Sequence, residues 1–129
     1  MPGRPLKVLI VDDEEAMREV LEMRLQSWGF EVGLAATGTE GRQMAESFEP
    51  DIVVTDVVMP GGMSGRQLAV RLLASHPRQK IIFTSGYNVE ETNTDFFRRG
   101  GAVFLQKPYT RTDLVRAVRE CLDKQAGSG

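Results

Sequence analysis

The stretch Asp51-Ile-Val-Val-Thr55, followed by Asp56, decides the fold class of this chain of 129 residues. Its apolar residues are consecutive and β-branched, without the in-out alternation of a half-exposed strand. Such runs are typical of central parallel strands that are covered on both faces. Two further runs have the same character, Lys7-Val-Leu-Ile-Val11 and Lys80-Ile-Ile-Phe-Thr84. The sequence therefore predicts a parallel sheet with helices on both sides.

The rest of the chain continues this pattern, because strand candidates alternate with longer segments of helical period. Two more strands are expected, at residues 31–35 and 102–105. Apolar residues at three- and four-residue steps predict helices packed on the sheet, over residues 17–28, 37–48, 65–75, 88–99 and 110–122. The fourth helix is the weakest, since Thr92-Asn-Thr-Asp95 are poor helix formers. We expect an α/β fold, a single doubly wound five-stranded parallel sheet of (βα)5 type.

Length, charge and cysteine content limit the classes of protein. One domain is expected over residues 1–124, with residues 125–129 as a flexible tail. The net charge of −2 disfavours a nucleic-acid binder, which usually has a basic face. Cys121 is the only cysteine, so an intrachain disulfide is excluded and a reducing cytoplasm is the expected location. No apolar run approaches the roughly 20 residues that span a bilayer, so no membrane contact by this domain is expected.

Polar residues follow four of the five strands at their carboxyl ends, where ligands bind in sheets of this kind. They are Asp12 and Asp13, Asp56, Ser85 and Lys107. Taken singly, each has an ordinary alternative as a helix cap, a turn residue or a solvated charge. Gathered together without a cation, however, the three carboxylates would repel one another and raise each other's pKa. The set therefore predicts a site for Mg²⁺, or Mn²⁺, which hard oxygen ligands favour.

Asp56 is the residue expected to carry the chemistry. A carboxylate can attack a phosphoryl group in line and form an acyl phosphate. A cation such as Lys107 neutralises charge that spreads over the transferring group. The hydroxyl of Ser85 can donate a hydrogen bond to a phosphoryl oxygen. These residue types predict phosphoryl transfer to Asp56.

Four motifs, in order along the chain, resemble the receiver domain of response regulators and hybrid histidine kinases. They are Asp12-Asp13, Asp56-Val-Val-Met59-Pro60 followed by Gly65, Thr84-Ser85-Gly86, and Lys107-Pro108. The resemblance covers residues 7–122 and implies the flavodoxin-like receiver topology. It also implies a phosphoacceptor switch in a two-component phosphorelay, not an enzyme as an isolated domain. The implied partner is a histidine kinase or a histidine phosphotransfer protein, and the implied state is a monomer or weak dimer.

The resemblance assigns a role to individual residues. Asp12 and Asp13 form the acidic metal pocket, Asp56 is phosphorylated, and the backbone carbonyl of Val58 is a further metal ligand. Three more roles concern the other side of the site. Ser85 is the switch hydroxyl, Phe104 is the coupling aromatic residue, and Lys107 pairs with the phosphoryl group and precedes a cis bond to Pro108.

Two departures from the family pattern stand near the site. The loop from Pro60 to Gly65 is one residue longer than the commonest version. The switch position is Ser85 where threonine is commoner, which keeps the hydroxyl and loses a methyl group.

The sequences Met59-Pro-Gly-Gly-Met-Ser-Gly65 and Gln106-Lys-Pro-Tyr109 are most similar to C-terminal receivers of hybrid sensor kinases. They favour that context over a stand-alone response regulator.

Three other functions share parts of this pattern. A flavodoxin-like electron carrier has the same fold, but Asp12-Asp-Glu-Glu15 would repel a flavin phosphate. An aspartate-based phosphohydrolase needs a second acid two residues after its nucleophile, where Val58 stands. A degenerate receiver that serves only as a docking module is disfavoured by the complete set of acids, hydroxyl and lysine.

Overall fold

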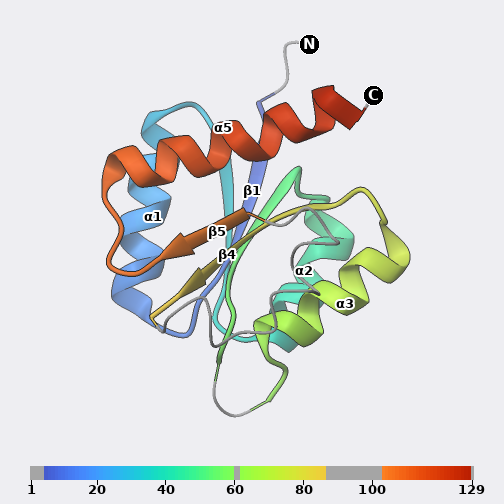
Figure 1. The fold of residues 1–129 in the computed structure, drawn as a ribbon. Helices are drawn as coiled ribbons and strands as arrows, with labels where there is room; N and C mark the ends of the chain where they lie inside the picture. Colours follow the sequence, from blue (N-terminus) through green and yellow to red (C-terminus); the bar gives the residue numbers. More distant parts are fainter. Residues whose placement is uncertain (1–4, 60–61, 87–102, 129) are drawn as a thin grey trace.

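The computed structural model describes residues 5–59, 62–86 and 103–128 of the chain (Figure 1). The expected fourth helix, residues 88–99, lies outside these ranges. The described elements are β1 (Lys7–Val11), α1 (Glu15–Ser27), β2 (Glu31–Ala35), α2 (Gly38–Phe48), β3 (Ile52–Asp56), α3 (Gly65–Ser75), β4 (Lys80–Ser85), β5 (Val103–Gln106) and α5 (Arg111–Ser128). Each of the five predicted strands is present, shifted by at most one residue at either end.

The strands form one parallel sheet in the order β2-β1-β3-β4-β5. The chain first moves from β1 to the edge strand β2, and then returns across β1 to build β3, β4 and β5 in the other direction. This confirms the predicted doubly wound fold. Because the connections leave β1 and β3 in opposite directions, a crevice is expected at the carboxyl ends of these two strands.

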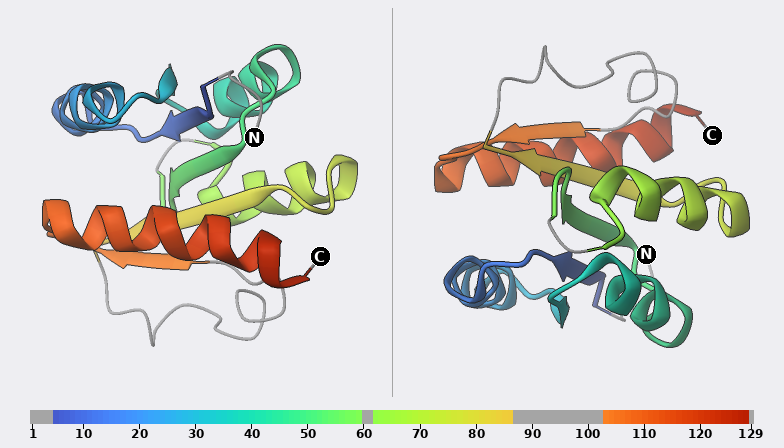
Figure 2. Two further views of the ribbon diagram at one scale, coloured as in Figure 1. Left: turned by 90° about the horizontal axis from the view of Figure 1, so that it is seen from above. Right: turned by 90° about the horizontal axis from the view of Figure 1, so that it is seen from below.

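Helices cover both faces of the sheet, with α1 and α5 on one side and α2 and α3 on the other (Figures 1 and 2). Strand β3 supplies both cores: Ile52 and Val54 pack with α1 and α5, whereas Val53 packs with α2 and α3. All three side chains are buried. The continuous apolar run of β3 is thus explained, since neither of its faces meets solvent.

Side chains cap the starts of α2 and α5. At α5, Thr110 and Asp113 cap each other, since each backbone N–H donates to the other side chain at 3.0 Å. At α2, the Thr37 hydroxyl accepts from the Glu40 N–H at 3.1 Å. The Glu40 carboxylate, however, accepts from the Ala36 N–H and not from that of Thr37. The Thr37 and Glu40 side chains therefore form only half of a capping box.

The end of the chain differs from the expected tail, because α5 continues to Ser128. Residues 125–128, assigned to a flexible tail, have helical backbone. Lys124, Gln125 and Ala126 are good helix formers, so the helix extends past Leu122, which packs on the core. Within the described ranges, no helix has both the length and the apolar character to cross a membrane.

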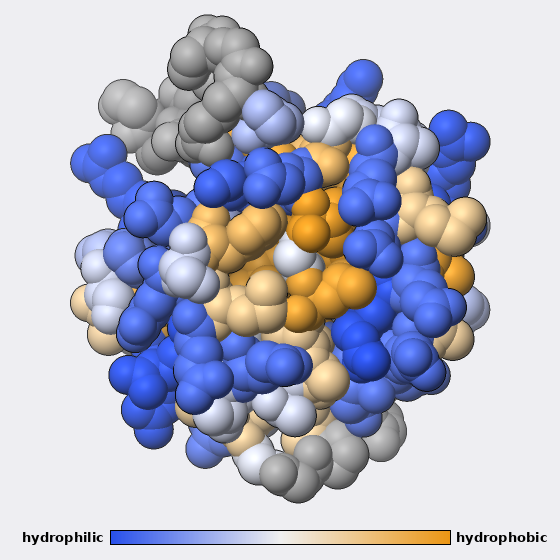
Figure 3. All heavy atoms as spheres, turned by 180° about the vertical axis from the view of Figure 1, so that it is seen from behind, coloured by the Kyte–Doolittle hydropathy of each residue, from blue (hydrophilic) through white to orange (hydrophobic). Residues whose placement is uncertain are grey.

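The side of the molecule that lies behind the sheet in Figure 1 is drawn in Figure 3. Apolar surface gathers at its centre and is ringed by hydrophilic surface. On the edge strand β2, Val32 and Leu34 pack against the core and are only partly buried. Behind them, Gly33 leaves room for α2, since an added Cβ would lie 3.3 Å from Met44 and from Phe48.

Candidate functional site

Asp12 is the most buried acid of the site, with 2% of its surface exposed. It follows β1, and its backbone N–H donates to the carbonyl of Ala35 at 3.1 Å, which ties it to the end of β2. Its Oδ1 atom accepts from the Glu14 N–H at 2.9 Å. The position and the direction of this carboxylate are therefore both fixed before any ligand binds.

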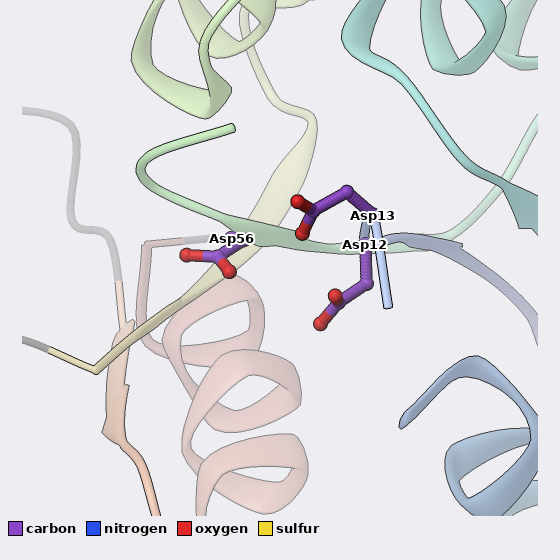
Figure 4. A group of neighbouring side chains, drawn as sticks. All are labelled: Asp12, Asp13 and Asp56. Carbon is purple, nitrogen blue, oxygen red and sulfur yellow. The ribbon is translucent and has the colours of Figure 1, made fainter. Parts of the chain in front are cut away.

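Asp13 and Asp56 complete a cluster of three carboxylates at the carboxyl ends of β1 and β3 (Figure 4). One oxygen atom from each of Asp12, Asp13 and Asp56 lies within 4.8 Å of the others. Asp13 is exposed, whereas the Asp56 side chain is only 13% exposed. The three acids that sequence analysis singled out are thus brought together at the predicted crevice.

Lys107 reaches this cluster from the end of β5. Its Nζ atom lies 3.0 Å from Oδ2 of Asp56 and 3.3 Å from Oδ2 of Asp12. The more exposed Glu14 is also in range, with 3.6 Å between Nζ and Oε1. The Lys107 backbone N–H donates to the Ser85 carbonyl at 2.7 Å, and the bond from Lys107 to Pro108 is cis. One ammonium therefore faces three carboxylates.

The electrostatics of the site follow from burial and from this excess of acids. Burial raises the pKa of the Asp56 carboxyl; the hydrogen bond from Lys107 opposes the rise and the Asp12 carboxylate adds to it. Burial alone would lower the pKa of Lys107, but the hydrogen bond to Asp56 and the charge of Asp12 raise it. Lys107 therefore remains a cation at physiological pH, and negative charge at Asp56 is only partly compensated.

Main-chain contacts hold the backbone around Asp56. The Thr55 hydroxyl donates to the Asp56 carbonyl at 3.1 Å. The Val58 N–H approaches Oδ1 of Asp56 at 3.4 Å, which brings the Val58 peptide against the carboxylate. The first residue of α3 closes the loop, since the Gly65 N–H donates to the Val57 carbonyl at 2.9 Å. Asp56 thus lies on a supported turn and not on a free loop.

Ser85 and Phe104 lie on the neighbouring strands. Ser85 is buried at the end of β4 and registers with Gln106, the residue before Lys107. Phe104 is half-buried on β5, and its ring stacks on Phe83 with 5.6 Å between the ring centroids. Ser85 on β4 and Phe104 on β5 thus lie on the two strands between Asp56 and the outer edge of the sheet.

The donor set fits a hard divalent cation. It contains three carboxylates, with one oxygen atom from each within 4.8 Å of the others, and their negative charge exceeds what Lys107 neutralises. Mg²⁺ takes one or two carboxylates and keeps open positions for water and phosphate oxygens. The observed cluster meets this requirement, with Asp13 on the solvent side.

Sequence analysis missed two residues of the site, Glu14 and Arg18. Glu14 contacts Lys107, and its N–H supports Asp12. The Arg18 guanidinium donates to the Asp12 carbonyl at 2.7 Å. The sequence did contain an indication of the role of Arg18. It lies three residues before Leu21 and seven before Leu25, and therefore on the buried face of α1. A cation at a core-facing position requires a buried acceptor.

Comparison with known proteins agrees with this geometry. The sensor kinase CckA of Brucella abortus is 41% identical over 120 residues, which are 92% of this chain and 13% of that protein. The chemotaxis protein CheY of Listeria monocytogenes is 30% identical over 116 residues, 89% of this chain and 97% of that protein. The crystal structure of a CheY-like response regulator receiver domain protein from Methanospirillum hungatei has a TM-score of 0.86 and 31% identity, and covers 98% of this chain and 100% of its own.

The matched relatives differ in length. The chain spans only 13% of CckA and 51% of the probable transcriptional regulatory protein TcrX of Mycobacterium tuberculosis. A family model, described as the response regulator receiver domain, matches residues 8–119. The chain belongs to the response regulator receiver domain family of two-component signalling.

Proposed function

We propose that this domain accepts a phosphoryl group on Asp56 from a phosphohistidine and changes its output face in response. The observation that carries the proposal is the contact of 3.0 Å between Lys107 and the Asp56 carboxylate inside a cluster of acids. The test is incubation with a phosphohistidine donor or a small acyl phosphate, followed by intact mass measurement. A gain of one phosphoryl group, lost again in base, is the expected result.

The transfer needs little covalent help from the protein. An Asp56 oxygen forms the new bond to phosphorus while the bond from phosphorus to the histidine nitrogen breaks, and the imidazole leaves with the electron pair. Lys107 lies where it can pair with the oxygens of the transferred group, so charge is neutralised without rearrangement. The supported backbone of Asp56 keeps its carboxylate in place for in-line attack.

Asp12, Asp13, Asp56 and the Val58 backbone carbonyl are the proposed ligands of Mg²⁺ or Mn²⁺. When bound, the ion supplies positive charge opposite the oxygens of the transferring group. The Asp12 carboxylate is held by a hydrogen bond from the Glu14 N–H, whereas Asp13 is exposed. Ser85 and Phe104 are the proposed switch pair, with Ser85 donating to the phosphoryl group and Phe104 following it.

The wider context is also a proposal. The similarity to CckA supports a receiver that belongs to a hybrid histidine kinase, and the full-length match to CheY supports the alternative of a stand-alone regulator. The partner would be a histidine kinase or a histidine phosphotransfer protein. We further propose a cytoplasmic domain, monomeric or weakly dimeric, that binds neither nucleic acid nor membrane and is not an enzyme in isolation.

Mg²⁺ should bind before any phosphoryl group is present. The repulsion among the three carboxylates gives the driving force, because a cation relieves it. Titration with Mg²⁺ should shift the backbone amide signals of Asp13 and Asp56, and excess chelator should reverse the shifts and stop phosphoryl uptake. Shifts confined to other regions, or uptake that persists in chelator, would contradict the assignment.

Val58 should slow the loss of the phosphoryl group. It is 51% exposed, two residues after the acceptor, and offers no group that orients an attacking water. We expect Val58→Asn to shorten the lifetime of the phosphorylated state several-fold, and a second change, Tyr87→Glu, to shorten it further; Tyr87 lies outside the described residues. Val70→Asn is the matched control, since Val70 is 49% exposed on α3. Equal decay in the double variant and the parent would show that water positioning is not the control.

A further inference from the structure

Arg18 makes an unusual contact for a helix residue beside an acidic site. It lies on the core-facing side of α1, in line with Leu21 and Leu25, and its side chain is half-buried. Its Nη1 atom donates to the Asp12 backbone carbonyl at 2.7 Å. This distance is short for an N–H···O hydrogen bond and is typical of a charged donor.

The acceptor of this bond is a main-chain atom at a sensitive position. The last registered pair of β1 is Val11 with Ala35, so the Asp12 carbonyl lies just beyond the ladder. The carbonyl of Asp12 and the N–H of Asp13 belong to one rigid peptide plane. A bond that fixes the carbonyl therefore also fixes the direction in which the chain enters Asp13.

Asp13 depends on this support more than Asp12 does. The Asp12 carboxylate accepts from the Glu14 N–H at 2.9 Å and lies 3.3 Å from Lys107. Asp13, by contrast, is exposed at the solvent side of the cluster. Its place within 4.8 Å of the other two acids thus rests mainly on the backbone that carries it.

We propose that Arg18 is a positioning residue that pre-organises the Asp12–Asp13 peptide so that both carboxylates face the metal together. The inference rests on the proposed function, in which these acids hold Mg²⁺. Arg18 acts through the Asp12 carbonyl and does not contact the ion or the acceptor.

A purely electrostatic role predicts the opposite result. The guanidinium is a positive charge close to the acids, so its removal alone would strengthen the attraction of Mg²⁺. Loss of a supporting hydrogen bond behind metal ligands instead weakens metal binding, typically by about 10- to 100-fold. The sign of the change in affinity therefore distinguishes the two roles.

The experiment compares Arg18→Met, Arg18→Lys and Arg24→Met with the parent chain. Arg18→Met keeps the apolar stem and loses both donor and charge, Arg18→Lys keeps the charge and one donor group, and Arg24→Met removes another half-buried arginine of α1. Mg²⁺ affinity is measured from the amide shifts of Asp13 and Asp56. Thermal unfolding without Mg²⁺ is recorded for each variant.

We expect Arg18→Met to bind Mg²⁺ about tenfold more weakly, Arg18→Lys to lie between it and the parent, and Arg24→Met to match the parent. Equal or tighter binding by Arg18→Met would overturn the proposal. If Arg18→Met does not fold, Arg18→Lys decides, and parental affinity there would overturn it. Failure of the proposed function would be seen separately, as a parent chain that takes up no phosphoryl group.

Discussion

Replacing Asp56 with asparagine should abolish phosphoryl uptake while leaving the fold intact. The amide has nearly the same shape but no anionic oxygen to attack phosphorus. The other two acids cannot substitute, since Asp12 is 2% exposed and held by the Glu14 N–H, and Asp13 lies farther out on another strand end. Intact mass after incubation with a small acyl phosphate should show no phosphorylated species above background.

The stability of this variant should not fall below that of the parent. Burial raises the pKa of the Asp56 carboxyl, so the charged form is disfavoured by folding, and a neutral amide avoids this penalty. Lys107 keeps Asp12 and Glu14 as partners. A urea melt should therefore give a free energy of unfolding equal to or above that of the parent.

Asp51→Asn is the matched control, because Asp51 precedes the same strand at its other end. Its Oδ2 atom accepts from the Lys7 N–H at 2.8 Å, and an asparagine carbonyl oxygen can accept the same bond. This variant should take up phosphoryl as the parent does. Undiminished labelling of Asp56→Asn, lost in both acid and base, would contradict the assignment of the acceptor.

The positions of the acids were predictable because strand ends are predictable. A continuous apolar run such as Val8 to Val11 ends where Asp12 begins, and parallel strands bring their carboxyl ends to one edge of the sheet. The proximity of Asp12, Asp13 and Asp56 could therefore be predicted from the order of strands and helices alone. No knowledge of side-chain packing was required.

The supporting contacts were not predictable in the same way. The bond from Arg18 to the Asp12 carbonyl depends on how α1 is rotated and tilted over the sheet, which apolar periodicity fixes only coarsely. The contact of Glu14 with Lys107 joins residues 93 positions apart, an exposed glutamate and a lysine whose side chain is 14% exposed. Such contacts follow from the packed structure, and no local pattern encodes them.

The end of α5 illustrates a limit of local reasoning. Small residues near a chain end, here Ala126-Gly-Ser, indicated a tail, but helical backbone continues through them. Helix propagation adds one hydrogen bond per residue at little cost once a helix exists. A helix anchored by Leu114 and Val118 can therefore continue through residues that favour a helix only weakly.

Replacing Gly65 with alanine should both destabilise the domain and reduce phosphoryl uptake. Gly65 is buried at the first turn of α3, directly against the backbone of Asp56. A Cβ atom there would lie 1.8 Å from the carbonyl oxygen of Asp56 and 3.1 Å from the Thr55 hydroxyl. The obstacle is main chain, so no side-chain rotation relieves it, and either α3 or the Asp56 peptide must move.

The size of the effect follows from two opposing contributions. Alanine favours a helix over glycine by up to about 1 kcal/mol. Forcing backbone shifts in a well-packed region typically costs about 1–3 kcal/mol, and occasionally more. Because the contact is far below van der Waals distance, we expect the cost of backbone shifts to reach the upper end of its range, with a net loss of about 2 kcal/mol in the free energy of unfolding.

Gly86→Ala is the control, since a Cβ atom at this exposed position meets no described residue within 4 Å. It should leave stability unchanged or slightly raised, because alanine restricts the unfolded chain. Urea unfolding and phosphoryl uptake are measured on both variants. Gly65→Ala should lose stability and uptake together, whereas Asp56→Asn loses uptake alone, and this difference separates a displaced acceptor from a missing one. A Gly65→Ala variant as stable and as reactive as the parent would show that the contact between α3 and Asp56 is looser than the structure describes.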